Sequence, residues 1–176
     1  KDGSVYWADV HTNVAQYLGK PAIQMFVVDI TQRKKAEEAL SRSEDRIKSI
    51  VSTSQEWIWA MDSGGHHTFS NPAVEKMLGY RLDEIIGHDV SQFIHEDDMS
   101  TVRHLLSRCI KDGVGWANLV LRWRHKDGSL RYLESNAMPI LDSTGVVTGF
   151  QGSDRDITER KKAEEALRAS GKAVER

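Results

Sequence analysis

An internal repeat constrains this chain more than any other feature of its sequence. The eight residues RKKAEEAL at 33–40 recur unchanged at 160–167. Two shorter words precede each copy in the same order, namely Lys-Asp-Gly-Ser at 1–4 and 126–129 and Asp-Ile-Thr at 29–31 and 156–158. A biased helix composition would explain the Lys and Glu residues but not three words in a fixed order. We therefore expect each copy to be the end of a domain followed by a charged helix.

The repeat divides the chain into four segments. We expect the last strands of a preceding domain over 1–31, a connector helix over 32–54, one complete domain over 55–158 and the start of a second connector helix over 159–176. Because the chain does not begin with methionine, we interpret it as a piece of a longer protein. The first segment would hold a single hairpin, and two strands alone are marginally stable. Its apolar residues should therefore depend on contacts outside the hairpin.

The complete domain begins with two predicted strands, at 56–61 and 67–70, around a Ser-Gly-Gly turn. Short helices should follow, the first capped by Asn71 before Pro72. Asp97 and Asp98 should then cap a longer helix. The apolar face of that helix is expected to hold Val102, Leu105, Leu106, Cys109 and Ile110.

Three further strands complete the predicted domain. They span 116–124, 130–140 and 146–153, and the first two flank the hairpin signal Asp127-Gly128. The alternation in the first of them places Ala117, Leu119, Leu121 and Trp123 on one face. Strands, then short helices, then strands indicate an α+β fold, with one five-stranded antiparallel sheet and short helices on one face.

These words, in this order, resemble the PAS sensor domain family with its C-terminal PAC motif. The resemblance rests on Asn71 to Tyr80 followed by Ile86-Gly87, on His95-Glu-Asp-Asp98 with Glu96 in place of the usual proline, and on the words at 123–129, 149–152 and 156–158. It covers residues 45–168 in full and residues 1–44 as a partial copy. The resemblance implies a sheet that cups a small cavity and links a stimulus to a kinase, a cyclase or a similar output domain.

Aromatic residues mark the expected inner face of the sheet. Either a ligand cavity or a plain hydrophobic core explains them, and the core needs fewer assumptions because both share one apolar signature. The candidate cavity residues are Trp57, Trp59, Phe69, Asn71, Leu106, Leu121 and Trp123.

The cofactor is unknown from the sequence. The flavin-binding branch of the family carries an Asn-Cys-Arg-Phe-Leu-Gln word that has no counterpart here, and Cys109 lies on a different helix, where a buried apolar role explains it. Haem-binding members place an axial histidine on the helix that holds His104. That residue lies at the edge of the apolar face, so a solvated histidine is the simpler interpretation. We expect no metal site.

No catalytic grouping accompanies these features. The sequence holds no nucleophile elbow, no phosphate-binding loop and no histidine-kinase words. The net charge of −2 provides no field that would attract nucleic acid. No apolar run approaches the roughly 20 residues of a membrane span. We expect a non-enzymatic, cytoplasmic module whose longer protein could still be attached to a membrane.

The connector helices carry the 4-3 spacing of a coiled-coil seam. Many seam positions are Ser or Ala, so the seam is weak and suits an element that shifts between two states. A helix that packs back on its own sheet is the alternative. The predicted homodimer seam consists of Ala36, Leu40, Ser43, Ile47, Ile50, Ala163 and Leu167.

Between the sheet and the second connector helix lie Asp156, Ile157 and Thr158, which we expect to transmit a signal. Thr158 fits the helix N-cap, and Asp156 either caps the turn or pairs with an arginine. Three functions remain open: a signal-transmitting homodimeric sensor of a multidomain protein, most simply a histidine kinase; a passive scaffold; and a haem-based redox or gas sensor. The expected partners are a second copy, the output domain of the same polypeptide and, where the cavity is filled, a small-molecule ligand.

Overall fold

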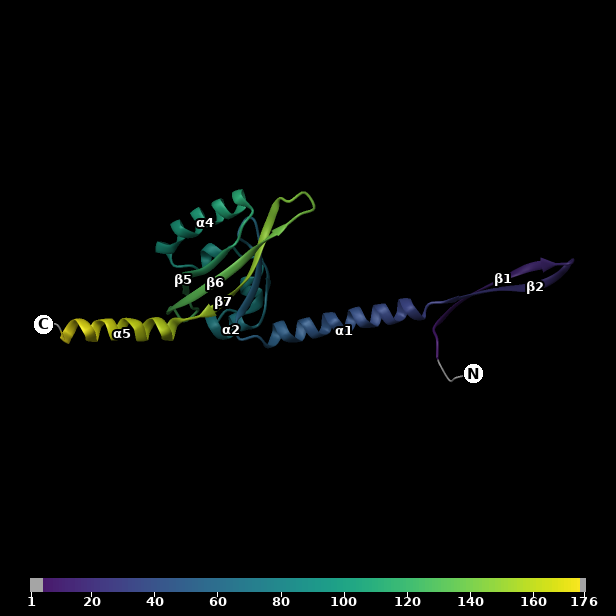
Figure 1. Ribbon diagram of the computed structural model, residues 1–176, viewed down its shortest axis with the longest axis horizontal. Coiled ribbons are helices and arrows are strands. Elements are labelled where there is room, and N and C mark those ends of the chain that lie inside the picture. The colour runs from purple at the N-terminus through teal and green to yellow at the C-terminus, as the bar shows by residue number, and fades with distance from the viewer. Residues whose placement is uncertain (1–4, 175–176) are drawn as a thin grey trace. The chain divides into compact units, whose positions relative to one another are not determined.

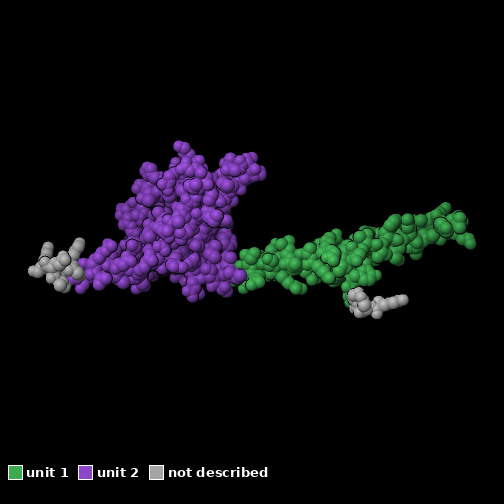
Figure 2. Space-filling view, in the orientation of Figure 1, with its two compact units in different colours: residues 1–49 green, residues 50–176 purple. Residues whose placement is uncertain are grey.

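The computed structural model describes the backbone of residues 5–174 and the side chains of residues 5–170 (Figure 1). The repeated word at 1–4 lies outside the described residues. The chain divides into two compact units, residues 1–49 and residues 50–176 (Figure 2).

The first unit is a two-stranded hairpin followed by most of a helix, whose last four residues, 50–53, belong to the second unit. Strands β1 (Ala8–Tyr17) and β2 (Lys20–Asp29) pair from Ala8 opposite Asp29 to Tyr17 opposite Lys20, and α1 (Thr31–Thr53) follows. Both residues of the tight turn, Leu18 and Gly19, have positive φ, as the twist of a two-residue hairpin requires. Large apolar side chains on both strands are exposed, among them Val10, Val14, Ile23, Phe26 and Val28.

The second unit has the expected α+β fold. Its elements are β3 (Trp57–Asp62), β4 (His67–Ser70), α2 (Ala73–Leu78), α3 (Leu82–Ile85), two 3-10 turns (Val90–Gln92 and Glu96–Asp98), α4 (Met99–Asp112), β5 (Trp116–Arg124), β6 (Leu130–Leu141), β7 (Val147–Asp156) and α5 (Thr158–Val174). The sheet is antiparallel with strand order β4-β3-β7-β6-β5. The central pair, β3 and β7, comes from opposite ends of the domain. That α1 and α5 each form a coiled coil with the same helix of a second copy stays a prediction.

The core lies between one face of this sheet and the short helices. Trp57, Trp59 and Met61 alternate inward along β3 because successive strand residues point to opposite faces. Val74 and Leu78 from α2 and Val102 and Cys109 from α4 cover them from the helical side. The core therefore encloses the inner sheet face, where the candidate cavity was expected.

Two predicted helix caps are wrong. Helix α2 begins after Pro72 without a side-chain cap, because the Asn71 side chain is engaged elsewhere. Asp98 does not cap α4 through its side chain either, because its carboxylate binds Arg122. The cap in that region is His95, whose Nδ1 accepts from the backbone N–H of Asp97 at 3.3 Å.

Strand β5 departs from its predicted alternation. The pairing with β6 shifts between Trp116 and Leu119, and Asn118 has a φ of 54°. This bulge turns Ala117 outward, contrary to prediction, and brings the Trp116 side chain to the inner face with Leu119. On α4, Ile110 was predicted to face inward but is 38% exposed.

Candidate functional site

A small cavity of about 30 Å³ lies between the inner sheet face and helix α4. Strand β3 contributes Trp59, and α4 contributes Val102 and Leu106. The other lining residues come from β3, β4, the 90–94 segment, α4, β5 and β6: Met61, His67, Val90, Ile94, Leu105, Trp116, Leu119, Leu121, Trp123 and Ser135. A water molecule needs roughly 10–15 Å³ of such space, so the cavity has room for about two water-sized groups.

Aromatic rings form one side of the cavity. The Trp57 ring stacks on His67 with centroids 5.4 Å apart and meets Trp123 edge-on at 5.0 Å. The Trp59 ring stacks on Trp116 at 6.0 Å. These contacts fix the orientation of the two lining residues His67 and Trp123 around a fully buried Trp57.

His67 is a neutral histidine inside this wall. It is 2% exposed, and burial lowers its pKa to about 4. At neutral pH the imidazole is therefore uncharged, with one ring nitrogen as a donor and the other as an acceptor. Its Nδ1 has no hydrogen-bond partner among the described residues.

A buried carboxyl group, Asp154, lies beside the cavity wall. Its Oδ1 accepts a 2.8 Å hydrogen bond from Trp59 Nε1, and its Oδ2 has no partner among the described residues. Burial raises the pKa of Asp154 to about 7, with the neighbouring Ser135 hydroxyl and then the Trp59 N–H acting in the opposite direction. Asp154 pairs with Ser135 of β6, whose Oγ accepts from Trp116 Nε1 at 3.1 Å. The central strands thus carry a titratable group in the core.

Four of the seven predicted cavity residues line the cavity: Trp59, Leu106, Leu121 and Trp123. Three do not. Trp57 is fully buried behind the wall, where its Nε1 donates to Ser70 Oγ at 2.8 Å. Phe69 is 44% exposed, because a bulge in β4 pairs it with Ala60 on the outer face while His67 pairs with Met61 on the inner one. That a ligand occupies the cavity stays a prediction.

Asn71, the third residue away from the cavity, ties β3 to the end of α1. Its Oδ1 accepts from Ile58 N at 3.0 Å, and its Nδ2 donates to the carbonyls of Val51 at 2.9 Å and Glu56 at 3.0 Å. The side chain is 1% exposed, so these bonds are shielded from water. Asn71 therefore holds the turn between α1 and the sheet rather than a ligand.

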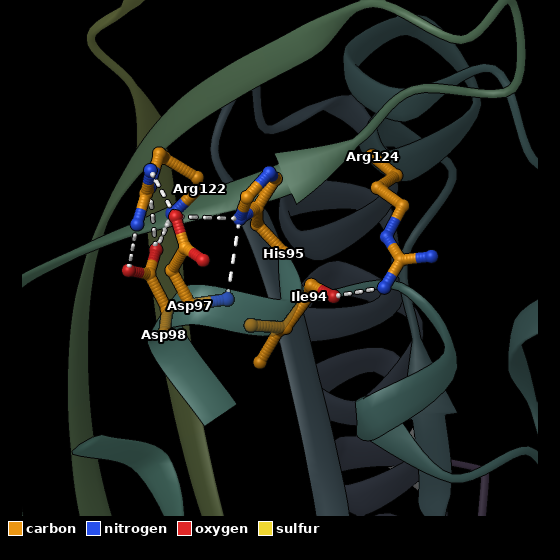
Figure 3. A network of polar contacts seen from close by, with 6 residues as sticks. All are labelled: Ile94, His95, Asp97, Asp98, Arg122 and Arg124. Atoms are coloured by element: carbon orange, nitrogen blue, oxygen red, sulfur yellow. Dashed lines mark hydrogen bonds and ion pairs between the residues drawn. The ribbon is translucent and has the colours of Figure 1, made fainter. Parts of the chain in front are cut away.

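A charged network holds the start of α4 against β5 (Figure 3). Arg122 donates from its Nε at 3.1 Å and its terminal NH2 at 2.6 Å to the carboxylate of Asp98, and from the other terminal nitrogen to Asp97 at 3.2 Å. The Arg122 guanidinium lowers the pKa of Asp98. Arg124 donates to the Ile94 carbonyl at 3.0 Å. The Ile94 carbonyl accepts from Arg124, and Trp123 lies between Arg122 and Arg124 on β5. Because Ile94 and Trp123 both line the cavity, the network fixes this part of the cavity wall.

His104 and Cys109 lie outside the cavity lining. The His104 side chain is exposed, and its Nδ1 lies 2.7 Å from the Ser100 carbonyl one turn earlier. Cys109 is fully buried, with its Sγ 3.6 Å from the Gly115 carbonyl. The structure therefore does not bring His104 to the cavity.

Asp156, Ile157 and Thr158 form a hydrogen-bonded corner between β7 and α5. The backbone N–H of Thr158 donates to Asp156 Oδ1 at 2.8 Å, so Asp156 caps the turn. Thr158 Oγ1 accepts from the backbone N–H of Tyr132 at 2.9 Å, and the Ile157 N–H donates to the Tyr132 carbonyl at 2.9 Å. We call this arrangement the Asp-Ile-Thr corner; through it the first turn of α5 is fixed to β6.

The first unit contains the same corner. The Thr31 N–H donates to Asp29 Oδ1 at 2.9 Å, and Thr31 Oγ1 accepts from the Trp7 N–H at 2.9 Å. The Ile30 N–H donates to the Trp7 carbonyl at 2.9 Å. Trp7 thus stands where Tyr132 stands in the second copy, so the repeated words make one repeated structure.

The predicted seam residues are exposed along single helices. Helix α1 has no buried residue, and Leu40, Ile47 and Ile50 are about 60% exposed. Ala36 and Ser43 on α1, and Ala163 and Leu167 on α5, are exposed as well. The homodimer seam stays a prediction.

Sequence reasoning missed His67 and Asp154 as interior polar groups. The signal for Asp154 was present, because it follows Phe150 and Gly152 at two-residue steps on a strand whose Phe150 is buried. The signal for His67 was hidden by the β4 bulge.

Comparison with known proteins gives the family. The model of the PAS fold matches residues 67–153. The PAS domain of a Colwellia psychrerythraea protein superposes with a TM-score of 0.60 at 23% identity, covering 65% of this chain and 97% of that one. A Burkholderia thailandensis sensory box histidine kinase/response regulator structure gives a TM-score of 0.58 at 25% identity over 74% of this chain and 98% of that one. The chain therefore belongs to the PAS sensor domain family.

Two curated relatives are signalling proteins. The methyl sulfide methyltransferase-associated sensor of Methanosarcina acetivorans is 27% identical across 100% of this chain, which spans 18% of that protein. Sporulation kinase A of Bacillus subtilis is 22% identical across 97% of this chain, which spans 28% of that protein. The chain is thus similar to a small part of each relative.

Within residues 5–174, no helix is both long enough and apolar enough to cross a membrane.

Proposed function

We propose that this chain is a homodimerising sensor module of a longer signalling protein, in which a change in the PAS sheet reaches an output domain through α5. The longer protein is proposed to be a sensor histidine kinase, because the proteins that this chain resembles include kinases. The module itself performs no chemistry; it changes the geometry of a helix.

The observation that carries the proposal is the duplicated Asp-Ile-Thr corner. A helix that merely follows a sheet needs no fixed junction. In both copies, however, the aspartate caps the turn, the threonine hydroxyl accepts from a backbone N–H of the neighbouring strand, and the isoleucine N–H donates to the carbonyl of that same strand residue. Thr158 is 2% exposed, so its hydroxyl cannot exchange Tyr132 for water without moving. A displacement of β6 against β7 is therefore passed to the axis of α5.

The position of Asp154 supports the direction of this coupling. Asp154 lies in the core, two residues before the Asp156 cap on the same strand. A change in the cavity wall that moves Trp59 or Ser135 acts on Asp154, because Trp59 donates to it and Ser135 is its register partner. The core and the start of α5 are thus linked through a few residues of β7.

Exposure of the seam supports the homodimer. Leu40, Ile47 and Ile50 recur at 4-3 spacing on one helix and are all more than half exposed in the single chain. Pairing of two α1 helices would bury them. The Ser and Ala residues between them keep the seam weak, so a small rotation of the helices is enough to change how they pair.

The repeated corner also supports the proposal that residues 1–31 are the end of a preceding PAS domain. The β1–β2 hairpin ends in the same junction as the β6–β7 hairpin. In the second copy, β7 pairs with β3 and β6 with β5, so both hairpin edges are covered. The hairpin of the first copy would be covered in the same way by strands of its own domain.

Removal of one hydroxyl tests the corner. Thr158→Val keeps the shape of the side chain but leaves the Tyr132 N–H unpaired, so we expect altered output from the longer protein while the domain stays folded. Thr144→Val, in an exposed turn where Thr144 Oγ1 donates to Asp142, is the matched control. If output is unchanged in both variants, the domain is a passive scaffold and the proposal fails.

A further inference from the structure

A polar pair in the core distinguishes the second copy of the repeat from the first. Ser135 and Asp154 are register partners on β6 and β7 and are 3% and 1% exposed. The equivalent register pair of the first copy is Val10 opposite Val27. Each pair lies three residues after the strand residue that bonds to the corner threonine and four residues before that threonine. Because the same register and the same corner form beside two valines, neither of them requires the polar pair.

The Asp154 carboxyl has few partners for a negative charge. Its Oδ1 accepts from Trp59 Nε1 at 2.8 Å, and its Oδ2 has no hydrogen-bond partner among the described residues. Ser135 Oγ accepts from Trp116 Nε1 at 3.1 Å, so the O–H of this serine remains to donate. A buried carboxylate is costly unless it is paired and hydrogen-bonded. The ionised form therefore depends on one indole and on the hydroxyl of the facing strand.

The groups that act on Asp154 are uncharged. Trp57 and Trp59 face it from β3, and Ser135 faces it from β6. His67 meets Trp59 edge-on, with ring centroids 6.3 Å apart. The helices that cover the sheet bury one further titratable side chain, the Cys109 thiol, among these residues of α2 and α4: Ala73, Val74, Met77, Leu78, Val102 and Cys109.

Asp154 and His67 change charge in different pH ranges. Burial raises the pKa of Asp154 to about 7, and it lowers the pKa of His67 to about 4. Near neutral pH the imidazole is therefore uncharged throughout, while the carboxyl gains or loses its proton.

We propose that the pair of Ser135 and Asp154 is a proton switch, and that the stimulus read by this domain is pH near neutrality. The inference rests on the proposed sensory role and names the stimulus. When Asp154 releases its proton to solvent, the charge on Oδ2 needs a donor and draws the Ser135 hydroxyl toward it. Strand β6 then moves against β7. Tyr132, three residues earlier on β6, carries this movement to Thr158 in the Asp-Ile-Thr corner.

The indole N–H of Trp59 reports the charge of Asp154, because it donates to that carboxyl. In the ¹⁵N-labelled chain of residues 1–176, a titration from pH about 5.5 to about 8.5 should shift the Trp59 indole resonance with a midpoint of about 7. The backbone amides of Tyr132 and Thr158 should shift with the same midpoint, because the switch acts on the corner.

The first copy of the corner is the internal control. The amides of Trp7 and Thr31 make the equivalent contacts but lie beside Val10 and Val27. They should not show the transition that Tyr132 shows.

Two variants test the pair. Asp154→Asn removes the titrating group, so the transition at Tyr132 and Thr158 should be lost. Ser135→Val combined with Asp154→Val installs the pair of the first copy, which is compatible with the same strand register, and should also abolish the transition. Asp112→Asn, at an exposed position, should leave the transition in place.

Three results would overturn the proposal. A Trp59 resonance that stays flat over this range would show that Asp154 keeps one charge state. A transition at Trp59 without one at Tyr132 and Thr158 would show that the proton does not act on the corner. The same transition in both Asp154 variants would assign it to another group.

The outcome is separable from the proposed function, which Thr158→Val tests at constant pH. Altered output in Thr158→Val together with a flat Trp59 titration overturns the proton as the stimulus and leaves transmission through the corner standing. Unchanged output in Thr158→Val together with a corner that titrates supports the proton switch and contradicts transmission through α5.

Discussion

The buried carboxyl of Asp154 makes the stability of this domain depend on pH in an unusual direction. Its pKa is about 7 in the folded domain, against 3.8 for the free side chain. The folded state therefore holds a proton that the unfolded state releases between these two values. This stabilisation is complete below pH 3.8 and is lost as the pH rises through 7. At about 1.4 kcal/mol for each pH unit, the loss is about 4 kcal/mol.

His67 acts in the opposite direction over nearly the same range. Its pKa falls from 6.5 to about 4 on burial, so the unfolded state binds the proton that the folded state excludes. The stability contributed by neutral His67 is complete above pH 6.5 and is lost as the pH falls through 4, by about 3 kcal/mol. The two contributions nearly cancel between pH 4 and 6.5, so the two groups together should leave the stability of the unmodified domain almost flat there.

Asp154→Asn should expose the contribution of His67. Asparagine keeps an oxygen that accepts from the Trp59 N–H. Its side-chain NH2 group is left without a partner, but the resulting loss of stability does not depend on pH. Urea unfolding followed by tryptophan fluorescence should then show the free energy of unfolding rising by about 3 kcal/mol from pH 4 to 6.5 in the variant. Asp112→Asn, at an exposed position, is the control and should follow the unmodified domain. If the Asp154→Asn profile runs parallel to that of the unmodified domain from pH 4 to 7, Asp154 does not titrate as the structure indicates.

Other predictions concern the dimer, the hairpin and the α1 tie. Leu40→Asp combined with Ile47→Asp should give a monomer in sedimentation analysis with the PAS domain still folded; a variant that stays dimeric at micromolar concentration contradicts the seam. Backbone amides of β1 and β2 should exchange with deuterium far faster than those of 119–123 in β5, and equal protection in a proven monomer would show that the hairpin needs no cover. Asn71→Ala leaves the Ile58 N–H unpaired and removes one donor each from the Val51 and Glu56 carbonyls, so it should cost about 2–3 kcal/mol and speed exchange at 51–58; Asn71→Asp, which turns a carboxylate oxygen toward those two carbonyls in a buried site, should cost more at neutral pH, and a smaller cost than that of Asn71→Ala would argue against the tie.

The sequence predicts the architecture of this domain well because turn residues and hydrophobic periodicity mark its strands and helices. The turn signals between the strands, the alternation expected along 116–124, the amphipathic face of α4 and the order of the elements were enough to indicate one antiparallel sheet with helices on one face. The repeat located the junctions at Asp29 and Asp156 without any structural information. These features are local, and local patterns are visible in a sequence.

The parts that failed depend on bulges and on long-range polar contacts. One extra residue in β4 moves Phe69 outward, and one in β5 moves Trp116 inward, yet neither changes the composition of the strand. Asn71 and Asp98 have the chemistry of helix caps, but Ile58 and Arg122, distant in sequence, engage their side chains instead. Such competition between partners is decided by the folded structure.

Insertion of residues after the Asp-Ile-Thr corner tests the central claim most directly. In the longer protein, one residue inserted between Thr158 and Lys161 rotates everything downstream on α5 by about 100°, which turns Ala163 and Leu167 away from a partner helix. Seven inserted residues nearly complete two turns and restore the direction of the seam. The account predicts that the single insertion strongly changes output while the seven-residue insertion leaves most of it intact. In both variants the PAS domain should stay folded. Equal output from the two insertions would mean that α5 is only a tether, and would contradict transmission through this helix.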